Sequence, residues 1–289
     1  MRTVTLSDHT ANQVNAAAAK RQADYDRTLE KYHAVLARQS QVKTELRMAL
    51  SEAWKERRIF SAIGCWWNLW RSGFESRPSA PRMASAGREE IVWSSGSEGE
   101  RKVSEFFSRR LSDDWTLISG YKNPKGEIDQ VLVGPSGVFA IEIKFVNGVV
   151  HCDGDQWSRD KYDRYGNLVE TGIRMQDKGG RGPSRQLNES VDRLQFFLGS
   201  RADIKRIYRV VVLSHDASRI GNLKNVRVDA VVTGGDTELA SIFSCSSIQL
   251  QTEEAAKIVR TIQKDHSFHE KSRSSQRHRE ARPARAAAA

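Results

Sequence analysis

GEIDQVLVGPSGVFAIEIKF, residues 126–145, is the stretch of this sequence that decides the fold. It consists of two segments rich in Val, Ile and Phe around Gly134–Gly137, a Gly-Pro-Ser-Gly sequence typical of a turn. Charged and apolar residues alternate toward the outer end of each segment, which is the pattern of a β-strand with two different faces. The stretch therefore predicts a β-hairpin.

The hairpin is expected to place four charged side chains on one face of a sheet. If Gly134–Gly137 forms the turn, Asp129 lies opposite Glu142, and Glu127 lies opposite Lys144. Opposed like charges destabilise a sheet by up to about 1 kcal/mol, so a cation is expected between the two facing carboxylates. The alternative is a solvated face on which Glu127 and Lys144 form an ordinary cross-strand ion pair.

These residues form a candidate metal site. The carboxylates of Asp129 and Glu142 and the backbone carbonyl of Ile143 are oxygen ligands of the kind that Mg²⁺ or Mn²⁺ binds. Lys144 follows directly and would meet an anion bound at that metal. A metal that polarises a phosphate and lowers the pKa of water, with a lysine to stabilise charge, suits hydrolysis of a phosphodiester.

Further segments around the hairpin complete a recognisable ordered pattern. The segments concerned are Gly96–Glu100, Gly126–Asp129, Gly137–Lys144, Trp157 and Pro183–Gln186. Over residues 94–200 this pattern resembles the nuclease-related domain family, NERD, of the PD-(D/E)XK nuclease superfamily. The resemblance implies an α/β, restriction-endonuclease-like fold, in which helices flank a mixed sheet.

The resemblance also implies a role for each matching residue. Asp129 and Glu142 would hold the metal, and Lys144 would be the catalytic lysine. Glu100 would add a carboxylate toward the metal or its water, and Gln186 would orient the lysine or a phosphate. The implied activity is that of a Mg²⁺- or Mn²⁺-dependent endonuclease or exonuclease, with DNA as the expected substrate.

Composition divides the chain into four regions. Residues 1–71 are expected to form a long helical arm with a Trp-rich end, and residues 72–90 form a linker rich in Ser, Pro, Arg and Gly. Residues 91–268 carry the strand and helix patterns of the nuclease-like domain. Residues 269–289 lack periodic apolar residues and are expected to be a disordered basic tail.

Two interpretations of the arm remain open. Residues 8–58 contain neither Gly nor Pro, and Tyr25, Leu29, Tyr32 and Leu36 follow heptad spacing. A polar stretch then interrupts this apolar stripe. The arm is therefore either a coiled coil that forms a homo-oligomer or a single helix that packs within its own chain.

The Trp-rich end of the arm is too short to cross a bilayer. Its apolar stretch, Ile59–Trp70, has 12 residues, whereas a membrane-spanning helix needs about 20. We expect an aromatic surface that packs against the domain or a partner chain. A helix lying on a membrane surface is the alternative.

Charge and cysteine content restrict the class of protein. The net charge of +10 favours an anionic partner, either nucleic acid or acidic lipid, and charge alone does not choose between them; with the family resemblance, nucleic acid is the expected partner. The three cysteines are far apart, which argues against a disulfide framework, and no signal peptide is evident, so a cytoplasmic location is expected. The second functional hypothesis is a non-catalytic nucleic-acid-binding or scaffold protein that uses the nuclease fold and the helical arm.

Overall fold

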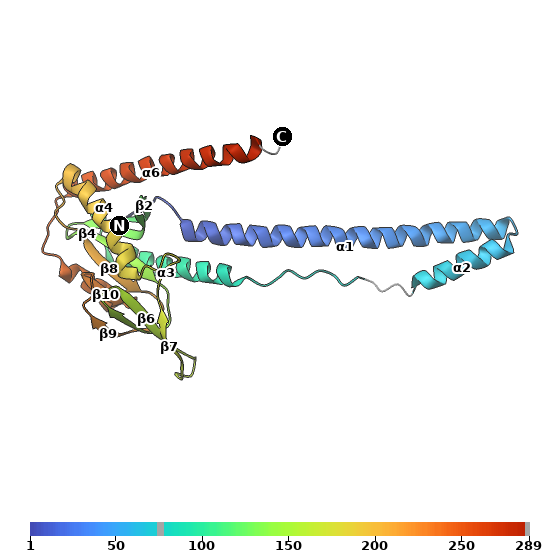
Figure 1. Cartoon of the computed structure of the whole chain (residues 1–289), viewed down its shortest axis with the longest axis horizontal. Helices are drawn as coiled ribbons and strands as arrows, with labels where there is room; N and C mark the ends of the chain where they lie inside the picture. Colours follow the sequence, from blue (N-terminus) through green and yellow to red (C-terminus); the bar gives the residue numbers. More distant parts are fainter. Residues whose placement is uncertain (74–77, 287–289) are drawn as a thin grey trace. The chain divides into compact units, whose positions relative to one another are not determined.

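The computed structural model describes residues 1–73 and 78–286 (Figure 1). The chain divides into two compact units, one formed by Met1–Asn12 with Val92–Ala289 and the other by Gln13–Ile91. The N-terminal elements are β1 (Arg2–Thr5), α1 (His9–Lys55), α2 (Ile59–Gly73) and α3 (Arg88–Arg110).

In the remaining elements of the larger unit, runs of strands are separated by helices. They are β2 (Thr116–Asn123), β3 (Gly126–Gly134), β4 (Gly137–Lys144), β5 (Gly148–Asp153), β6 (Gln156–Tyr162), β7 (Leu168–Arg174), α4 (Pro183–Ala202), β8 (Tyr208–Leu213), β9 (Ser218–Lys224), β10 (Ala230–Thr233), α5 (Asp236–Ser241), η1 (Ile242–Cys245) and α6 (Thr252–Ala286).

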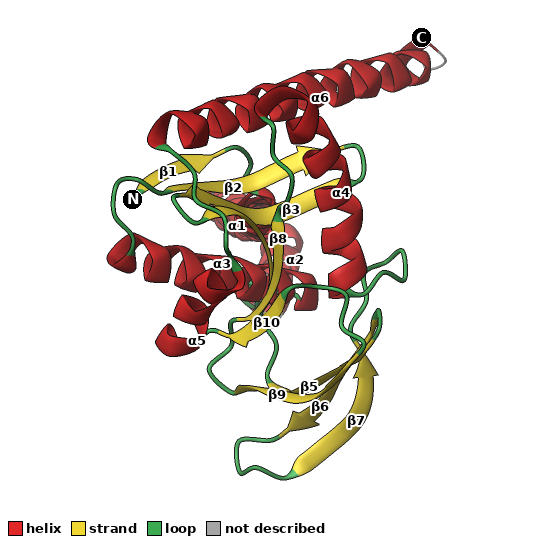
Figure 2. Cartoon of the chain, turned by 90° about the vertical axis from the view of Figure 1, so that its left-hand side faces the viewer, coloured by secondary structure: helices red, strands yellow, loops and turns green. Residues whose placement is uncertain are grey.

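Two mixed sheets form this unit, and both are drawn in yellow in Figure 2. The six-stranded sheet has the order β1-β2-β3-β4-β8-β10, in which β2, β3 and β4 are antiparallel neighbours and β8 is parallel to β4. The four-stranded sheet has the order β7-β6-β5-β9. The α/β class with mixed sheets flanked by helices is therefore confirmed.

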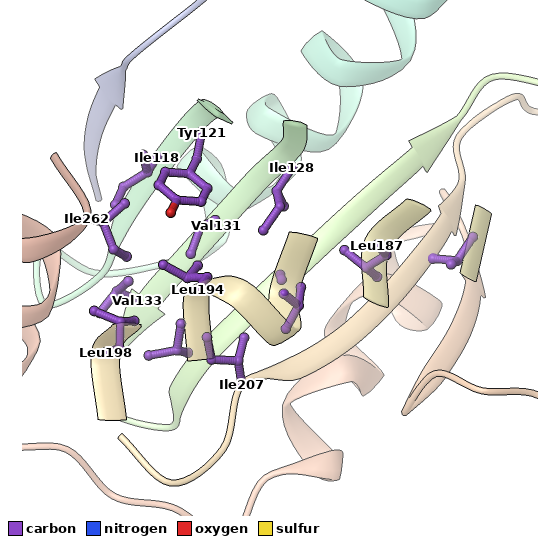
Figure 3. Packing of buried hydrophobic residues seen from close by; sticks show 14 of the residues in the cluster. Ile118, Tyr121, Ile128, Val131, Val133, Leu187, Leu194, Leu198, Ile207 and Ile262 are labelled. Atoms are coloured by element: carbon purple, nitrogen blue, oxygen red, sulfur yellow. The ribbon is translucent and has the colours of Figure 1, made fainter. Parts of the chain in front are cut away.

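Helices cover the six-stranded sheet on both faces. On one face, Val103 and Phe107 of α3 pack with Leu132 and Phe139. On the other face, apolar residues of α4 and α6 form the larger core (Figure 3); among them are Leu187, Leu194, Leu198, Ile258 and Ile262. Burial on both faces explains why the central strands read as nearly continuous apolar segments.

The predicted hairpin is present, but its ladder is shorter than expected. Gly134 pairs with Gly137, and the ladder ends at Gln130 and Ile141. Beyond these residues β3 pairs only with β2, and β4 continues beside β8. The expected pairings of Asp129 with Glu142 and of Glu127 with Lys144 are therefore both absent from the ladder, because the two strands separate before those positions.

Two terminal segments differ from the expectation. Residues 2–5, assigned to the helical arm, instead form the edge strand β1, which pairs in parallel with β2. Residues 269–286, expected to be disordered, continue α6, and only residues 287–289 of the predicted tail lie outside the description. This segment contains five Arg and three Ala, which favour the helix, and it extends the existing helix without any apolar stripe of its own.

The smaller unit consists of α1, α2 and the chain that follows them. α1 ends at Lys55, and Arg57 adopts a positive φ of 56° at the turn into α2. The expected coiled coil stays a prediction. Within residues 1–73 and 78–286, no helix is both long enough and apolar enough to cross a membrane.

Candidate functional site

A pocket lies where β3 and β4 separate, and it contains all five side chains that were predicted to be catalytic. Its volume is about 230 Å³. The residues that line it are Glu100, Gly126, Glu127, Asp129, Glu142, Lys144, Arg181, Gln186 and Ser190. The structure thus brings together residues from α3, the hairpin and α4 that are far apart in the sequence.

The Asp129 side chain occupies the position at which the β3–β4 ladder stops. Its Oδ2 accepts a hydrogen bond from the backbone N–H of Ile143 at 2.7 Å. A side chain therefore satisfies a backbone donor that a continued strand pair would have used. The backbone carbonyl of Ile143 was the third expected metal ligand. In the structure the N–H of Ile143 contacts Asp129, and Ile143 does not line the pocket.

Burial makes the negative charge of Asp129 unfavourable. Burial and the nearby Glu142 carboxylate raise the pKa of Asp129 well above its usual value, with a further contribution from Glu100. Lys144 and the hydrogen bond from the Ile143 N–H lower the pKa of Asp129, but they do not cancel the increase. A carboxylate of this kind is stabilised when another cation approaches it.

Lys144 is held as a cation beside the carboxylates. Its Nζ lies 2.7 Å from Oε1 of Glu142, whose side chain is only 5% exposed. Burial alone would lower the pKa of Lys144, but the charges of Glu142 and Asp129 raise it above the usual value. Lys144 therefore stays protonated at neutral pH, and it neutralises part of the negative charge of the pocket.

The first turn of α4 orients the Gln186 amide. Gln186 Nε2 donates to the backbone carbonyl of Arg181 at 2.7 Å, so its Oε1 is left to accept from Lys144 Nζ at 3.3 Å. Pro183 occupies the first turn of the helix, as expected from its fixed φ. The buried Trp157 donates to Ser184 Oγ at 2.9 Å and so fixes the start of this helix.

Close contacts between α3 and the sheet position Glu100. Gly99 lies so near β8 that an added Cβ would come within 2.5 Å of Ser214 Oγ. Gln130 is buried on this face, and its Nε2 donates to the Glu100 carbonyl at 3.0 Å and to Ser104 Oγ at 2.8 Å. These contacts hold the helix backbone at the point from which Glu100 reaches the pocket.

The pocket also contains residues whose part in it was not expected from the sequence. Ser190 is fully buried, and its Oγ has no hydrogen-bond partner among the described residues. A Cβ added to Gly126 would lie 2.7 Å from that oxygen, so only glycine fits there without displacement. Nothing in the sequence around Ser190 distinguishes it from any other polar residue of a helix.

Two pocket-lining charges are already paired with other side chains. Glu127 accepts from Ser7 Oγ at 3.0 Å and lies 3.4 Å from Lys122 Nζ. Arg181 pairs with Asp177 at 2.7 Å and with Glu189 at 3.1 Å. Glu127 and Arg181 therefore stabilise the walls of the pocket.

The acidic groups suit a metal bound mainly by water. Among the side chains that the structure describes, no set of three or more His, Cys, Asp and Glu is arranged to hold a metal ion. Asp129 and Glu142 supply two carboxylates, which is the number of protein ligands that Mg²⁺ commonly takes while it keeps several waters. The donor set therefore fits Mg²⁺ or Mn²⁺ better than a metal that needs a closed protein cage.

A larger pocket of about 520 Å³ lies on the four-stranded sheet and contains none of the predicted site residues. His151, Cys152 and Asp155 are among the residues that line it. Burial and the nearby Asp155 raise the pKa of the Cys152 thiol to about 11, so this cysteine is a poor nucleophile at neutral pH.

Comparison with known proteins finds one similarity, to a protein family. Residues 95–214 match the family described as the nuclease-related domain, NERD, whose known context is the PD-(D/E)XK superfamily. No curated protein and no solved structure matches the chain. The matched segment begins in α3, ends just after β8 and includes every residue that lines the 230 Å³ pocket. The match over residues 95–214 shows that this part of the chain is similar to the NERD family, which suggests a nuclease-related function.

Proposed function

We propose that this protein is a metal-dependent nuclease that hydrolyses phosphodiester bonds in DNA. The observation that carries the proposal is the convergence of Glu100, Asp129, Glu142, Lys144 and Gln186 on one pocket inside the NERD match. Four separate elements, α3, β3, β4 and α4, supply these side chains, and a fold that used the sheet only as a platform would gain no stability from neighbouring carboxylates.

Asp129 and Glu142 would hold Mg²⁺ or Mn²⁺. When bound, such an ion supplies positive charge to the phosphate and lowers the pKa of a water molecule. The raised pKa of Asp129 supports this assignment, because burial and Glu142 leave its charge incompletely compensated. The Ile143 N–H fixes one oxygen of Asp129 and so orients the carboxylate before any ligand arrives.

Lys144 would stabilise negative charge on the phosphate. It is cationic and only 27% exposed, so the charge acts in a partly desolvated environment, where it is worth more than in water. Gln186 holds the ammonium group through an amide whose orientation is set by the Arg181 carbonyl. Glu100, whose charge already influences Asp129, would accept a proton from water or add a carboxylate to the metal site.

Charge supports nucleic acid as the substrate class. The chain carries a net charge of +10, and residues 271–289 contribute six Lys or Arg against one Glu. Residues 178–185, a basic segment beside the pocket, contribute less than their composition suggests. Arg181 and Arg185 both pair with Glu189, at 3.1 and 2.9 Å.

A cleavage assay on supercoiled, linear and single-stranded DNA tests the proposal, with Mg²⁺, Mn²⁺ or EDTA in the buffer. We expect cleavage with either metal and none with EDTA, and nicking of the closed circle would identify an endonuclease. Glu142→Gln should abolish cleavage. Glu127→Gln is the matched control, because Glu127 lines the same pocket but is held by Ser7 and Lys122, and it should retain most of the activity.

The same experiment distinguishes the alternative function. A protein that binds DNA but cleaves none of the three substrates with either metal would be a non-catalytic nucleic-acid-binding or scaffold protein. Equal activity of Glu142→Gln and the unmodified protein would move the catalytic site away from this pocket.

A further inference from the structure

Helix α2 has two sides of different character. Ala62, Cys65, Leu69 and Ser72 recur at helical spacing and are buried or half-buried. The large apolar side chains instead lie on the adjacent surface of the helix and are exposed; they are Ile59, Phe60, Ile63, Trp66, Trp67 and Trp70. At 100° per residue, these six positions fall within an arc of roughly 120°. They form a contiguous apolar face, which we call the tryptophan face.

The exposure of the tryptophan face is unusually large. Phe60 is 92% exposed, and Trp66 and Trp67 are 55% and 54% exposed. Single apolar residues on a protein surface are ordinary, but a contiguous patch of this size commonly marks a binding surface.

The chemistry of the helix indicates what it binds. From Arg57 to Gly73 the sequence contains Arg57, Arg58 and Arg71 and no Asp or Glu. Arg58 pairs with Glu56 just before the helix at 2.9 Å, whereas Arg71 lies in the last turn of α2 next to Trp70. An apolar face on a helix that contains no carboxylate and has Arg71 in its last turn complements a surface that is apolar inside and anionic outside.

We propose that α2 binds the surface of a bilayer that contains anionic lipid. The helix has 15 residues and a length of roughly 22 Å, which is less than the ~30 Å of a hydrocarbon core. It therefore lies in the plane of the interface. The tryptophans insert at the level of the headgroups, where their amphipathic rings are favoured, and the arginines contact lipid phosphates. The competing possibility, which was expected from the sequence, is that protein covers the tryptophan face, either the domain of the same chain or a partner chain.

The test is co-sedimentation of the full-length protein with vesicles. We expect binding to vesicles of phosphatidylcholine with phosphatidylglycerol, and much weaker binding to phosphatidylcholine alone. The double substitution Trp66→Ala and Trp70→Ala should weaken binding to the anionic vesicles at least tenfold. Arg71→Gln should weaken it less, and only on the anionic vesicles.

Phe196→Ala is the matched control. Phe196 is an aromatic residue of α4 that is 80% exposed and does not line the candidate active site. This variant should bind vesicles as the unmodified protein does. Thermal unfolding of each variant should match the unmodified protein, because the substituted side chains are exposed and do not belong to a core. Quenching of tryptophan fluorescence by lipid with brominated acyl chains should be strong for the unmodified protein and weak for the double variant.

Two results would overturn the proposal. If the double variant binds as tightly as the unmodified protein, the binding comes from basic charge elsewhere, such as residues 271–289. If the unmodified protein does not bind anionic vesicles, while the double variant changes oligomeric state, the tryptophan face is covered by a second copy of the chain.

Discussion

Replacing Asp129 by Asn is expected to stabilise the metal-free protein while it abolishes cleavage. The amide has nearly the same shape, and its oxygen can still accept the hydrogen bond that the Ile143 N–H donates to Asp129 at 2.7 Å. The substitution therefore removes the charge and leaves the hydrogen bond in place. A neutral amide is a poor ligand for Mg²⁺, so the activity should be lost.

The expected gain in stability follows from the raised pKa of Asp129. Burial and the charge of Glu142 raise that pKa above the reference value of 3.8, so the folded state favours the protonated acid. Below pH 3.8 the carboxyl group is protonated in both states and has no effect. As pH rises from there through the folded-state pKa, stability is lost. Like charges on neighbouring strands cost up to about 1 kcal/mol, and we expect a gain of this size for Asp129→Asn at pH 7 because Glu142 is close enough to raise the pKa of Asp129.

Urea unfolding in EDTA, measured in a series from pH 3.5 to pH 7, checks this expectation. The difference between the variant and the unmodified protein should be small at the acid end and should grow to about 1 kcal/mol at pH 7. With Mg²⁺ at ten times its dissociation constant, the unmodified protein should gain about 1.4 kcal/mol and the variant almost nothing. A variant that is less stable than the unmodified protein at pH 7 in EDTA would show that Asp129 is a structural ion-pair partner and would refute the reasoning. Cleavage at the unmodified rate would refute the metal site itself.

Three further predictions follow from the same structure. Lys144→Ala should abolish cleavage. Unlike Asp129→Asn, it should also lower the unfolding free energy of the metal-free protein by about 2 kcal/mol, because it removes the cation that contacts Glu142 at 2.7 Å. Isothermal titration should still detect Mg²⁺ binding, and a stabilised variant would contradict this assignment. Removing residues 271–289 takes away a charge of +5. The slope of log affinity against log salt concentration for duplex DNA should then become shallower, by roughly 0.9 for each phosphate that these residues neutralise. An unchanged slope would place the phosphate-binding residues elsewhere. If residues 8–58 form a coiled coil, analytical ultracentrifugation should show a dimer or larger species for the full chain and a monomer for a chain that starts at residue 88; equal states would exclude the coil.

The hairpin was predictable because the residues that specify it are close together in the sequence. The turn sequence at Gly134–Gly137 fixes the register, and alternation along each strand assigns the faces. The end of the ladder was not predictable in this way. It depends on the Asp129 side chain, which accepts a hydrogen bond from the backbone of Ile143 on the neighbouring strand, and strand patterns contain no information on such a hydrogen bond.

The site residues that lie outside the hairpin could not be predicted from strand patterns. Glu100 and Gln186 lie on helices far from the hairpin in the sequence, and only the resemblance to a family suggested their roles. Ser190 matches no part of that pattern, and its place in the pocket depends on the packing of α4 against the turn at Gly126. The continuation of α6 was missed because apolar periodicity reports packing against a core, whereas a polar helix can extend beyond it.

The geometry of the pocket explains how the fold tolerates the neighbouring carboxylates of Asp129 and Glu142. Glu142 lies on a strand that is paired on one side with β8 and packed on both faces, so it cannot move away from Asp129 without disrupting the core. The Asp129 carboxylate is fixed in turn by the Ile143 N–H. Lys144 offsets part of the repulsion, yet the pKa of Asp129 remains raised. The core therefore supplies the free energy that holds the two acids together, and the uncompensated charge is what a divalent cation would neutralise.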